Sequence, residues 1–201
     1  MDFDHPVWED EKWIVPTDWN IVSQRFEGWS SQAQAVIKVW APSLPCILQP
    51  AHVDSNEPTK LLDKPDLATW AFWDTAPAST YTRGRVAMLG DAAHATTPFQ
   101  GQGAGQAIED AAVIMTVLSK VQDLKQIPNA LMAYNQIRRP RAQQVVETSR
   151  EYGKLLGMQS EGVGEDLEKM RENLETRMHW IWQRNQTAQL NGAVELFAES
   201  L

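Results

Sequence analysis

Residues 84–111, with the sequence GRVAMLGDAAHATTPFQGQGAGQAIEDA, constrain the fold of this chain more than any other stretch. Their first apolar run, residues 85–89, predicts a short strand of the kind that is buried on both faces. Gly90 and Asp91 follow at the carboxyl end of this strand, where ligands bind in open α/β sheets. A glycine-rich loop then leads into a helix. This order predicts a ligand site formed by Asp91 and the loop.

The helix after the loop is expected to begin near Ala104 and to run to about Lys120. Apolar side chains cover most of its circumference, so we expect it to be largely buried, with a narrow polar stripe of Gln106, Glu109, Thr116 and Lys120. Free backbone N–H groups at its start would stabilise an anion, a phosphate or a polarised carbonyl. The pattern favours a ligand with hydroxyl groups near Asp91 and an electron-rich edge near residues 101–105. On spacing alone, an ordinary turn without a ligand is an equal alternative.

The rest of the chain indicates an α+β fold. The sequence pattern is typical of strands over residues 11–16 and 69–75, and it is typical of one or two helices over residues 19–40. Five prolines indicate an irregular connector over residues 41–66. After the glycine-rich loop we expect three long helices: the one described above, a second over residues 129–156 that Pro140 kinks, and a last one that begins near Leu167. The predicted architecture is a small mixed or antiparallel region, one strand, the loop and these helices.

Charge and composition exclude several classes of function. The formal net charge of −8 argues against binding to nucleic acid and to an anionic membrane surface. No apolar run approaches the length of a membrane helix, and the single cysteine, Cys46, cannot form an internal disulfide, so we expect a cytoplasmic protein. The four histidines lack the spacing of metal ligands, and no metal is expected.

Residues 84–111 closely resemble the second flavin-binding fingerprint of the FAD-dependent aromatic hydroxylases, the group A flavoprotein monooxygenases, and above all their fungal, salicylate-hydroxylase-like branch. The resemblance extends to WAFWDTAPASTYTRGRV (70–86), YNQIRRPRAQQVVETSREYG (134–153) and RMHWIWQRNQTAQ (177–189). It implies that Asp91 binds the ribityl chain of FAD. It also implies that the loop and the start of the next helix lie against the isoalloxazine ring, with the helix field favouring negative charge at one ring edge.

The resemblance implies two sets of site residues and assigns no catalytic residue. The cofactor-binding set is Gly90, Asp91, Pro98, Gly101, Gln102, Gly103 and Ala104, and the substrate-side set is Trp70, Phe72, Pro98 and Phe99. From the residues alone, the aromatic side chains near residue 70 could equally pack in a core. His94 is expected to be a structural partner of the loop rather than an acid or base. Arg138, Arg139 and Arg141 are expected to pair with carboxylates on neighbouring elements rather than to clamp an anion.

One departure from the family pattern is the absence of its G-x-G-x-x-G unit, because the only glycine before residue 84 is Gly28. The chain therefore looks like the C-terminal half of such an enzyme, with a partial substrate-binding domain over 1–82 and part of the FAD-binding domain with a helical tail over 83–201. We expect FAD to bind weakly or not at all to this chain alone. We also expect exposed apolar side chains at Val86, Met88, Ile108 or Met115 that a second copy or a partner chain would cover.

The implied function is hydroxylation of an aromatic or phenolic, polyketide-like substrate of secondary metabolism, with FAD and NAD(P)H. Two alternatives stay open. One is a flavin-free domain that catalyses a non-redox cyclisation or isomerisation of a natural-product intermediate. The other is a non-enzymatic fragment or subunit.

Overall fold

The computed structural model describes residues 11–17, 20, 21, 24, 27, 28, 66 and 68–201. The chain falls into two units, one within residues 2–71 and one over residues 72–201. In the first unit, strand β1 (Ile14–Pro16) pairs antiparallel with β2 (Ala68–Trp70). Strand β1 lies within the run predicted for it, whereas β2 overlaps the predicted run only at Thr69 and Trp70, and residues 71–75 are not in a strand. The predicted connector and most of the predicted helical stretch over 19–40 lie outside the described residues.

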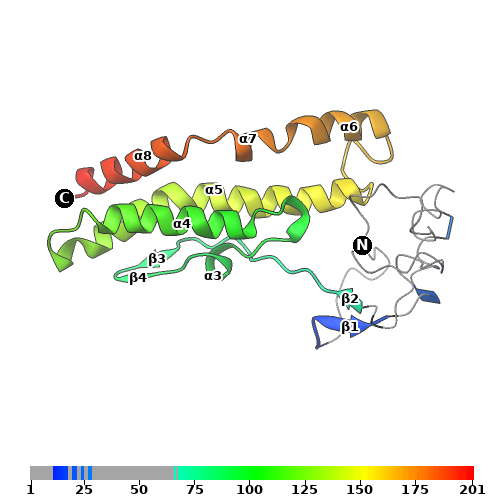
Figure 1. Ribbon diagram of the computed structural model, residues 1–201, viewed down its shortest axis with the longest axis horizontal. Coiled ribbons are helices and arrows are strands. Elements are labelled where there is room, and N and C mark those ends of the chain that lie inside the picture. Colours follow the sequence, from blue (N-terminus) through cyan, green and yellow to red (C-terminus); the bar gives the residue numbers. More distant parts are fainter. Residues whose placement is uncertain (1–10, 18–19, 22–23, 25–26, 29–65, 67) are drawn as a thin grey trace, which may run out of the picture. The chain divides into compact units, whose positions relative to one another are not determined.

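The second unit is mainly helical (Figure 1). Its elements in chain order are β3 (Thr82–Arg83), β4 (Val86–Ala87), α3 (Asp91–His94), η3 (Pro98–Gln100), α4 (Gly103–Leu118), η4 (Leu124–Gln126), α5 (Ile127–Leu156), α6 (Leu167–Thr176), α7 (His179–Trp182) and α8 (Gln186–Glu199). Helices α4 and α8 both pack against the long helix α5, and they also contact each other. The predicted division of the chain after residue 82 stays a prediction.

The core of this unit lies between α4, α5 and α8. Small side chains and the three aromatic rings of Tyr81, Tyr134 and Phe197 fill it, and the other buried residues include Val113, Ala130 and Ala193. Alanines on α5 and α8 let the helix backbones approach closely, while the aromatic rings fill the remaining space. The helices that follow the glycine-rich loop therefore form a packed scaffold behind it.

The predicted strand over 85–89 is shorter and more exposed than expected. Only Val86 and Ala87 are in a strand, and they pair antiparallel with β3 across a tight turn at Gly84, which has φ of +60°. Val86 is 68% exposed and Leu89 44% exposed, so the prediction of burial on both faces is wrong. The physical reason is that β4 pairs only with β3 within a two-stranded sheet of the described residues, and no second sheet layer covers it.

Helix α4 begins at Gly103, which confirms the predicted start, but the prediction of its buried face is wrong. Gln106 and Asp110 are almost completely buried, whereas Ile108 and Met115 are 70% and 72% exposed. Polar side chains of α4 point inward because the buried guanidinium group of Arg138 on α5 binds Gln106 and Asp110. The expected exposure of apolar side chains on this helix is confirmed.

Of the remaining helices, α5 is continuous as predicted, whereas the last predicted helix is not. Helix α5 continues through Pro140, whose missing N–H group lies on an exposed side of the helix. The single last helix that we predicted is instead three helices, α6, α7 and α8, and Asn185 caps the last of them by accepting from the Ala188 N–H at 3.0 Å. None of the helices in the described part of the chain is long and apolar enough to cross a membrane.

Candidate functional site

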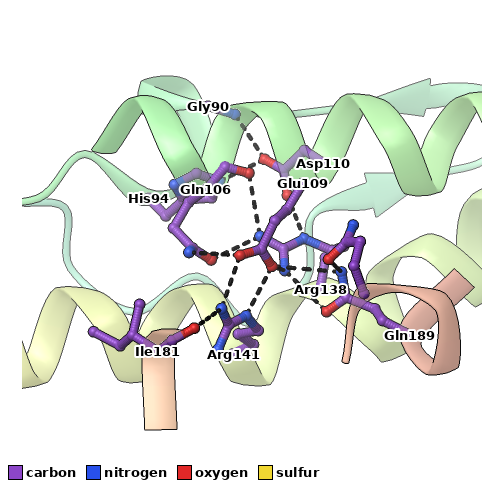
Figure 2. A network of polar contacts seen from close by, with 10 residues as sticks. Gly90, His94, Gln106, Glu109, Asp110, Arg138, Arg141, Ile181 and Gln189 are labelled. Atoms are coloured by element: carbon purple, nitrogen blue, oxygen red, sulfur yellow. Dashed lines mark hydrogen bonds and ion pairs between the residues drawn. The ribbon is translucent and has the colours of Figure 1, made fainter. Parts of the chain in front are cut away.

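Asp110 on α4 is the centre of a buried network of polar contacts (Figure 2). Its carboxylate accepts hydrogen bonds from the Gly90 N–H at 3.0 Å, from Nε2 of His94 at 2.5 Å and from Nε of Arg138 at 2.8 Å. The three donors come from the end of the β3–β4 hairpin, from α3 and from α5. Asp110 therefore joins three elements that are far apart in the sequence.

Two arginines of α5 extend the network toward Glu109 and α8. Arg138, which is completely buried, also donates to the carboxylate of Glu109 at 2.5 Å and to Oε1 of Gln106 at 2.8 Å. Arg141 donates to both oxygens of Glu109, at 2.7 and 2.8 Å. Two guanidinium groups thus face two carboxylates, which compensates much of the cost of burying these charges.

The network keeps both carboxylates ionised. Burial would raise the pKa of Asp110, but hydrogen bonds from His94, the Gly90 N–H and Arg138 and the charge of Arg138 hold that pKa below its usual value. Burial likewise opposes ionisation of Glu109, while Arg141, Arg138 and Gln189 lower its pKa. The anionic form of Asp110 is what lets it accept three hydrogen bonds at once.

The network positions Gly90 and Asp91, the first two residues of the predicted site. Gly90 has φ of 59° and ψ of −143°, a conformation open mainly to glycine, and a Cβ atom there would lie 3.5 Å from Cβ of Ala107. Asp91 begins α3, and its side chain is exposed. Its carboxylate has no hydrogen-bond or ion-pair partner among the described residues, and it does not cap α3 or the loop.

The glycine-rich loop is held against α5 by a pair of hydroxyl groups. The Ser149 hydroxyl donates to the carbonyl oxygen of Thr97 at 2.7 Å, and the Thr97 hydroxyl contacts the Ser149 hydroxyl at 3.0 Å. Gly101 then takes the left-handed conformation with φ of 62°, and α4 begins at Gly103 without any side-chain cap. The first N–H groups of α4 are therefore available to an acceptor outside the helix.

Of the predicted substrate-side residues, the structure brings Phe72 to the loop. The rings of Phe72 and Phe99 make an edge-to-face contact, with centroids 6.1 Å apart at 85°. Phe72 is 54% exposed, so it does not serve as a core residue of its unit. Trp70 belongs to β2 in the other unit.

Sequence reasoning anticipated part of the network. Pairing of Arg138 and Arg141 with carboxylates is confirmed, and His94 makes a structural contact, although its partner is Asp110 on α4 rather than the loop. Arg139 instead lies 3.5 Å from the carbonyl oxygen of Ala78. The central role of Asp110 was missed. Its signal is the adjacent pair Glu109–Asp110 on one helix, matched by two arginines three residues apart on the next.

Comparison with known proteins identifies the family. The family model described as "FAD binding domain" matches residues 47–149, which is more than half of the chain. The 6-methylsalicylate 1-monooxygenase of Aspergillus terreus is 38% identical over 192 residues, which cover 96% of this chain and 38% of that protein. A salicylate hydroxylase of Pseudomonas putida is 35% identical over 179 residues, which cover 88% of this chain and 36% of that protein.

A solved structure gives the same answer for the fold. The substrate complex of a salicylate hydroxylase matches with a TM-score of 0.75 and 33% identity over 94% of this chain and 41% of that one. The chain thus spans about two fifths of the length of the proteins to which it is similar. The chain belongs to the family of FAD-dependent, aromatic-hydroxylase-like proteins.

Proposed function

We propose that this chain supplies the part of an FAD site that faces the flavin ring, within an enzyme that hydroxylates an aromatic substrate. The observation that carries the proposal is the exposed carboxylate of Asp91, which has no partner among the described residues although it sits at the end of a rigid, buried network. A carboxylate with no structural contact, held beside an uncapped helix start, is available for a ligand.

The residues present fit the ring and ribityl part of FAD. Asp91 can accept hydrogen bonds from the hydroxyl groups of the ribityl chain. The free N–H groups at Gly103 and the residues after it can donate to an electron-rich ring edge, and the positive end of α4 favours negative charge there. Glycines at 101 and 103 leave room for a close approach, since a Cβ at Gly101 would meet no atom within 4 Å. Of the remaining cofactor-side residues, Pro98 begins η3, Gln102 directly precedes α4 and Ala104 lies in its first turn.

When bound, FAD supplies the oxygen-transfer chemistry, and the protein contributes placement and field. The exposed ring of Phe72 and the half-buried ring of Phe99 form an aromatic wall next to Pro98 that suits a flat aromatic substrate. The names of the relatives, which refer to salicylate and 6-methylsalicylate, support a phenolic substrate. We assign reduction of the flavin to NAD(P)H, by analogy with the family.

The sequence contains no G-x-G-x-x-G unit of the kind that holds the adenosine half of a dinucleotide, so we propose that this half needs further contacts. We propose that further polypeptide, a second copy or a partner chain supplies them. The exposed apolar side chains of α4 and β4 support this, because monomeric proteins rarely leave such a patch open.

Substitution of Asp91 tests the proposal. Purified chain should bind riboflavin and FAD weakly, and Asp91→Asn should weaken both by about 1–3 kcal/mol, the cost of removing a partner from a bound polar group. Flavin fluorescence quenching measures the affinity, and thermal unfolding on the same samples should show an unchanged melting temperature. Glu195→Gln, which changes an exposed carboxylate on α8, is the matched control.

Two results would contradict the proposal. One is wild-type chain that binds no riboflavin even at millimolar concentration. The other is Asp91→Asn that lowers the melting temperature and leaves flavin affinity unchanged, which would make Asp91 a structural residue. Chain that purifies yellow, with about one FAD per molecule, would show that our expectation of weak binding is wrong.

A further inference from the structure

A cavity of about 150 Å³ opens on the side of α3 and α5 in the unit over residues 72–201. Its apolar wall is made by Ala76, Pro77, Ala93 and Val146, and His94 lies in the same wall. Neither Asp91 nor residues 98–103 line it. The cavity therefore calls for its own explanation.

The hydrogen bonds of Asp110 determine which nitrogen of His94 carries the proton. Asp110 is held in its anionic form, so it can only accept hydrogen bonds, and Nε2 of His94 lies 2.5 Å from its Oδ2. Nε2 must therefore carry a proton. In the neutral imidazole the other nitrogen, Nδ1, is then an acceptor with a free lone pair.

Nδ1 of His94 has no hydrogen-bond partner among the described residues, although His94 is 98% buried, with an exposed fraction of 2%. Other polar groups of the cavity wall are already engaged. The Thr75 hydroxyl donates to Ala95 O at 3.1 Å, and Gln143 donates to Ala78 O at 2.7 Å. Nδ1 is not among the side-chain atoms that are both fully buried and without a partner, so it keeps some accessible surface. A hydrogen-bond donor inside the cavity could therefore reach it.

We propose that this cavity is a binding site for a small phenol, whose hydroxyl group donates to Nδ1 of His94 while its ring lies against Ala76, Pro77 and Val146. The volume is sufficient for one ring, because a cavity of about 150 Å³ can hold a benzene molecule. The ring would lie on the apolar part of a wall that also contains the polar side chains of Thr75, Gln143, Glu147 and Arg150. The ligand supplies the donor that Nδ1 lacks and an apolar ring for the apolar wall.

The charges around the cavity favour a neutral phenol over a carboxylate. Arg150 is the cation in the wall, and its Nε already pairs with Asp74 at 2.7 Å. Glu147, also in the wall, and Asp110 behind the imidazole would repel an anion. Arg138 already pairs with the carboxylates of Glu109 and Asp110. The ring of Tyr81 lies 6.0 Å from that of His94 and is neutral, because burial and, second, the charge of Asp110 raise the pKa of Tyr81 to about 12.

Titration of the full chain with phenol tests the proposal, with anisole and fluorobenzene as ring-matched probes that cannot donate a hydrogen bond. Phenol should bind about tenfold more tightly than either probe, the factor expected for one buried hydrogen bond. In protein labelled with ¹⁵N-histidine, the NMR signals of His94 should show the Nε2–H form, and phenol should shift the Nδ1 signal.

Two variants separate a specific site from weak general binding. Ala76→Leu, which places a larger side chain in the wall without touching the network, should weaken phenol binding at least tenfold, whereas Ala198→Leu on the exposed side of α8 should not. Asp91→Asn should leave phenol binding unchanged, so the phenol site can fail or hold independently of the flavin site. Any of four results would overturn the proposal. These are equal affinity for phenol and fluorobenzene, an Nδ1–H form of His94, unaltered phenol binding in Ala76→Leu, and a cavity that takes up only water.

Discussion

Replacing Asp110 by asparagine tests whether the buried network holds the predicted flavin site in place. The substitution keeps the shape of the side chain but removes its charge and turns one of its oxygen atoms into an NH₂ group. That NH₂ group then faces a donor, because the carboxylate oxygens accept from the Gly90 N–H, from His94 and from Arg138. At least one buried donor loses its partner.

The cost follows from the burial of the groups involved. The side chains of Asp110 and Arg138 are both 0% exposed, and breaking a buried ion pair costs about 3–5 kcal/mol. Arg138 keeps its contacts to Glu109 and Gln106, so we expect the lower end, about 3 kcal/mol. For a chain of this length that corresponds to a fall in melting temperature of roughly 6–12 °C.

Urea unfolding followed by circular dichroism measures this loss, and the acid side of the pH range gives a second readout. The pKa values of Asp110 and Glu109 are held below those of free carboxyls, so the unfolded chain binds more protons in acid. The stabilisation is complete above the unfolded-state pKa, near 4, and is lost as the pH falls through the lower folded-state pKa. Asp110→Asn should therefore show a smaller loss of stability between neutral pH and acid than the wild type.

An exposed pair provides the control. Glu168 is 84% exposed and lies 3.7 Å from Arg171, so Glu168→Gln should leave the unfolding curve unchanged. A loss below about 1 kcal/mol in Asp110→Asn, or an acid profile identical to that of the wild type, would refute the argument that this network stabilises the site.

Two further predictions concern the backbone and the exposed helix face. Gly90→Ala should lower the free energy of unfolding by about 1–3 kcal/mol, because the φ and ψ of Gly90 disfavour a residue with a side chain. Gly192→Ala within α8 should instead raise the free energy of unfolding by roughly 0.5–1 kcal/mol, since a Cβ there would lie at an ordinary contact distance of 3.6 Å from Cδ1 of Ile137. Equal effects of the two substitutions in urea unfolding would contradict this prediction. Met115 is 72% exposed on α4, so Met115→Lys should reduce concentration-dependent self-association in light scattering, and a wild-type chain that stays monomeric at all concentrations would count against an apolar docking face.

The parts of the fold that could be predicted from sequence are those that local chemistry determines. The start of α4 follows from glycines that lead into a run of helix formers. Aromatic and β-branched residues predicted β1, and they predicted β2 in part, at Thr69 and Trp70. Each of these signals lies within a few residues of the element that it specifies.

The face of α4 that points inward could not be predicted in this way. Periodicity assigns the inward face to apolar residues, and by that criterion Ile108 and Met115 should be buried and Asp110 exposed. The observed order is reversed, because the partner of Asp110 is Arg138, 28 positions later and on another helix. A pattern within one helix contains no information about a buried charge on its neighbour.

The same long-range pairing explains why a site can exist on so short a segment. Gly90 and Asp91 belong to a stretch with only a two-residue strand before it and a four-residue helix after it, neither of which is stable alone. Asp110 binds the Gly90 N–H and His94 on either side of Asp91, and Ser149 holds the loop at Thr97. Rigidity is thus imposed from α4 and α5, while the Asp91 carboxylate itself takes part in none of these contacts. A binding site requires a side chain that its neighbours position without forming hydrogen bonds to it, because its full hydrogen-bonding capacity then stays available for the ligand.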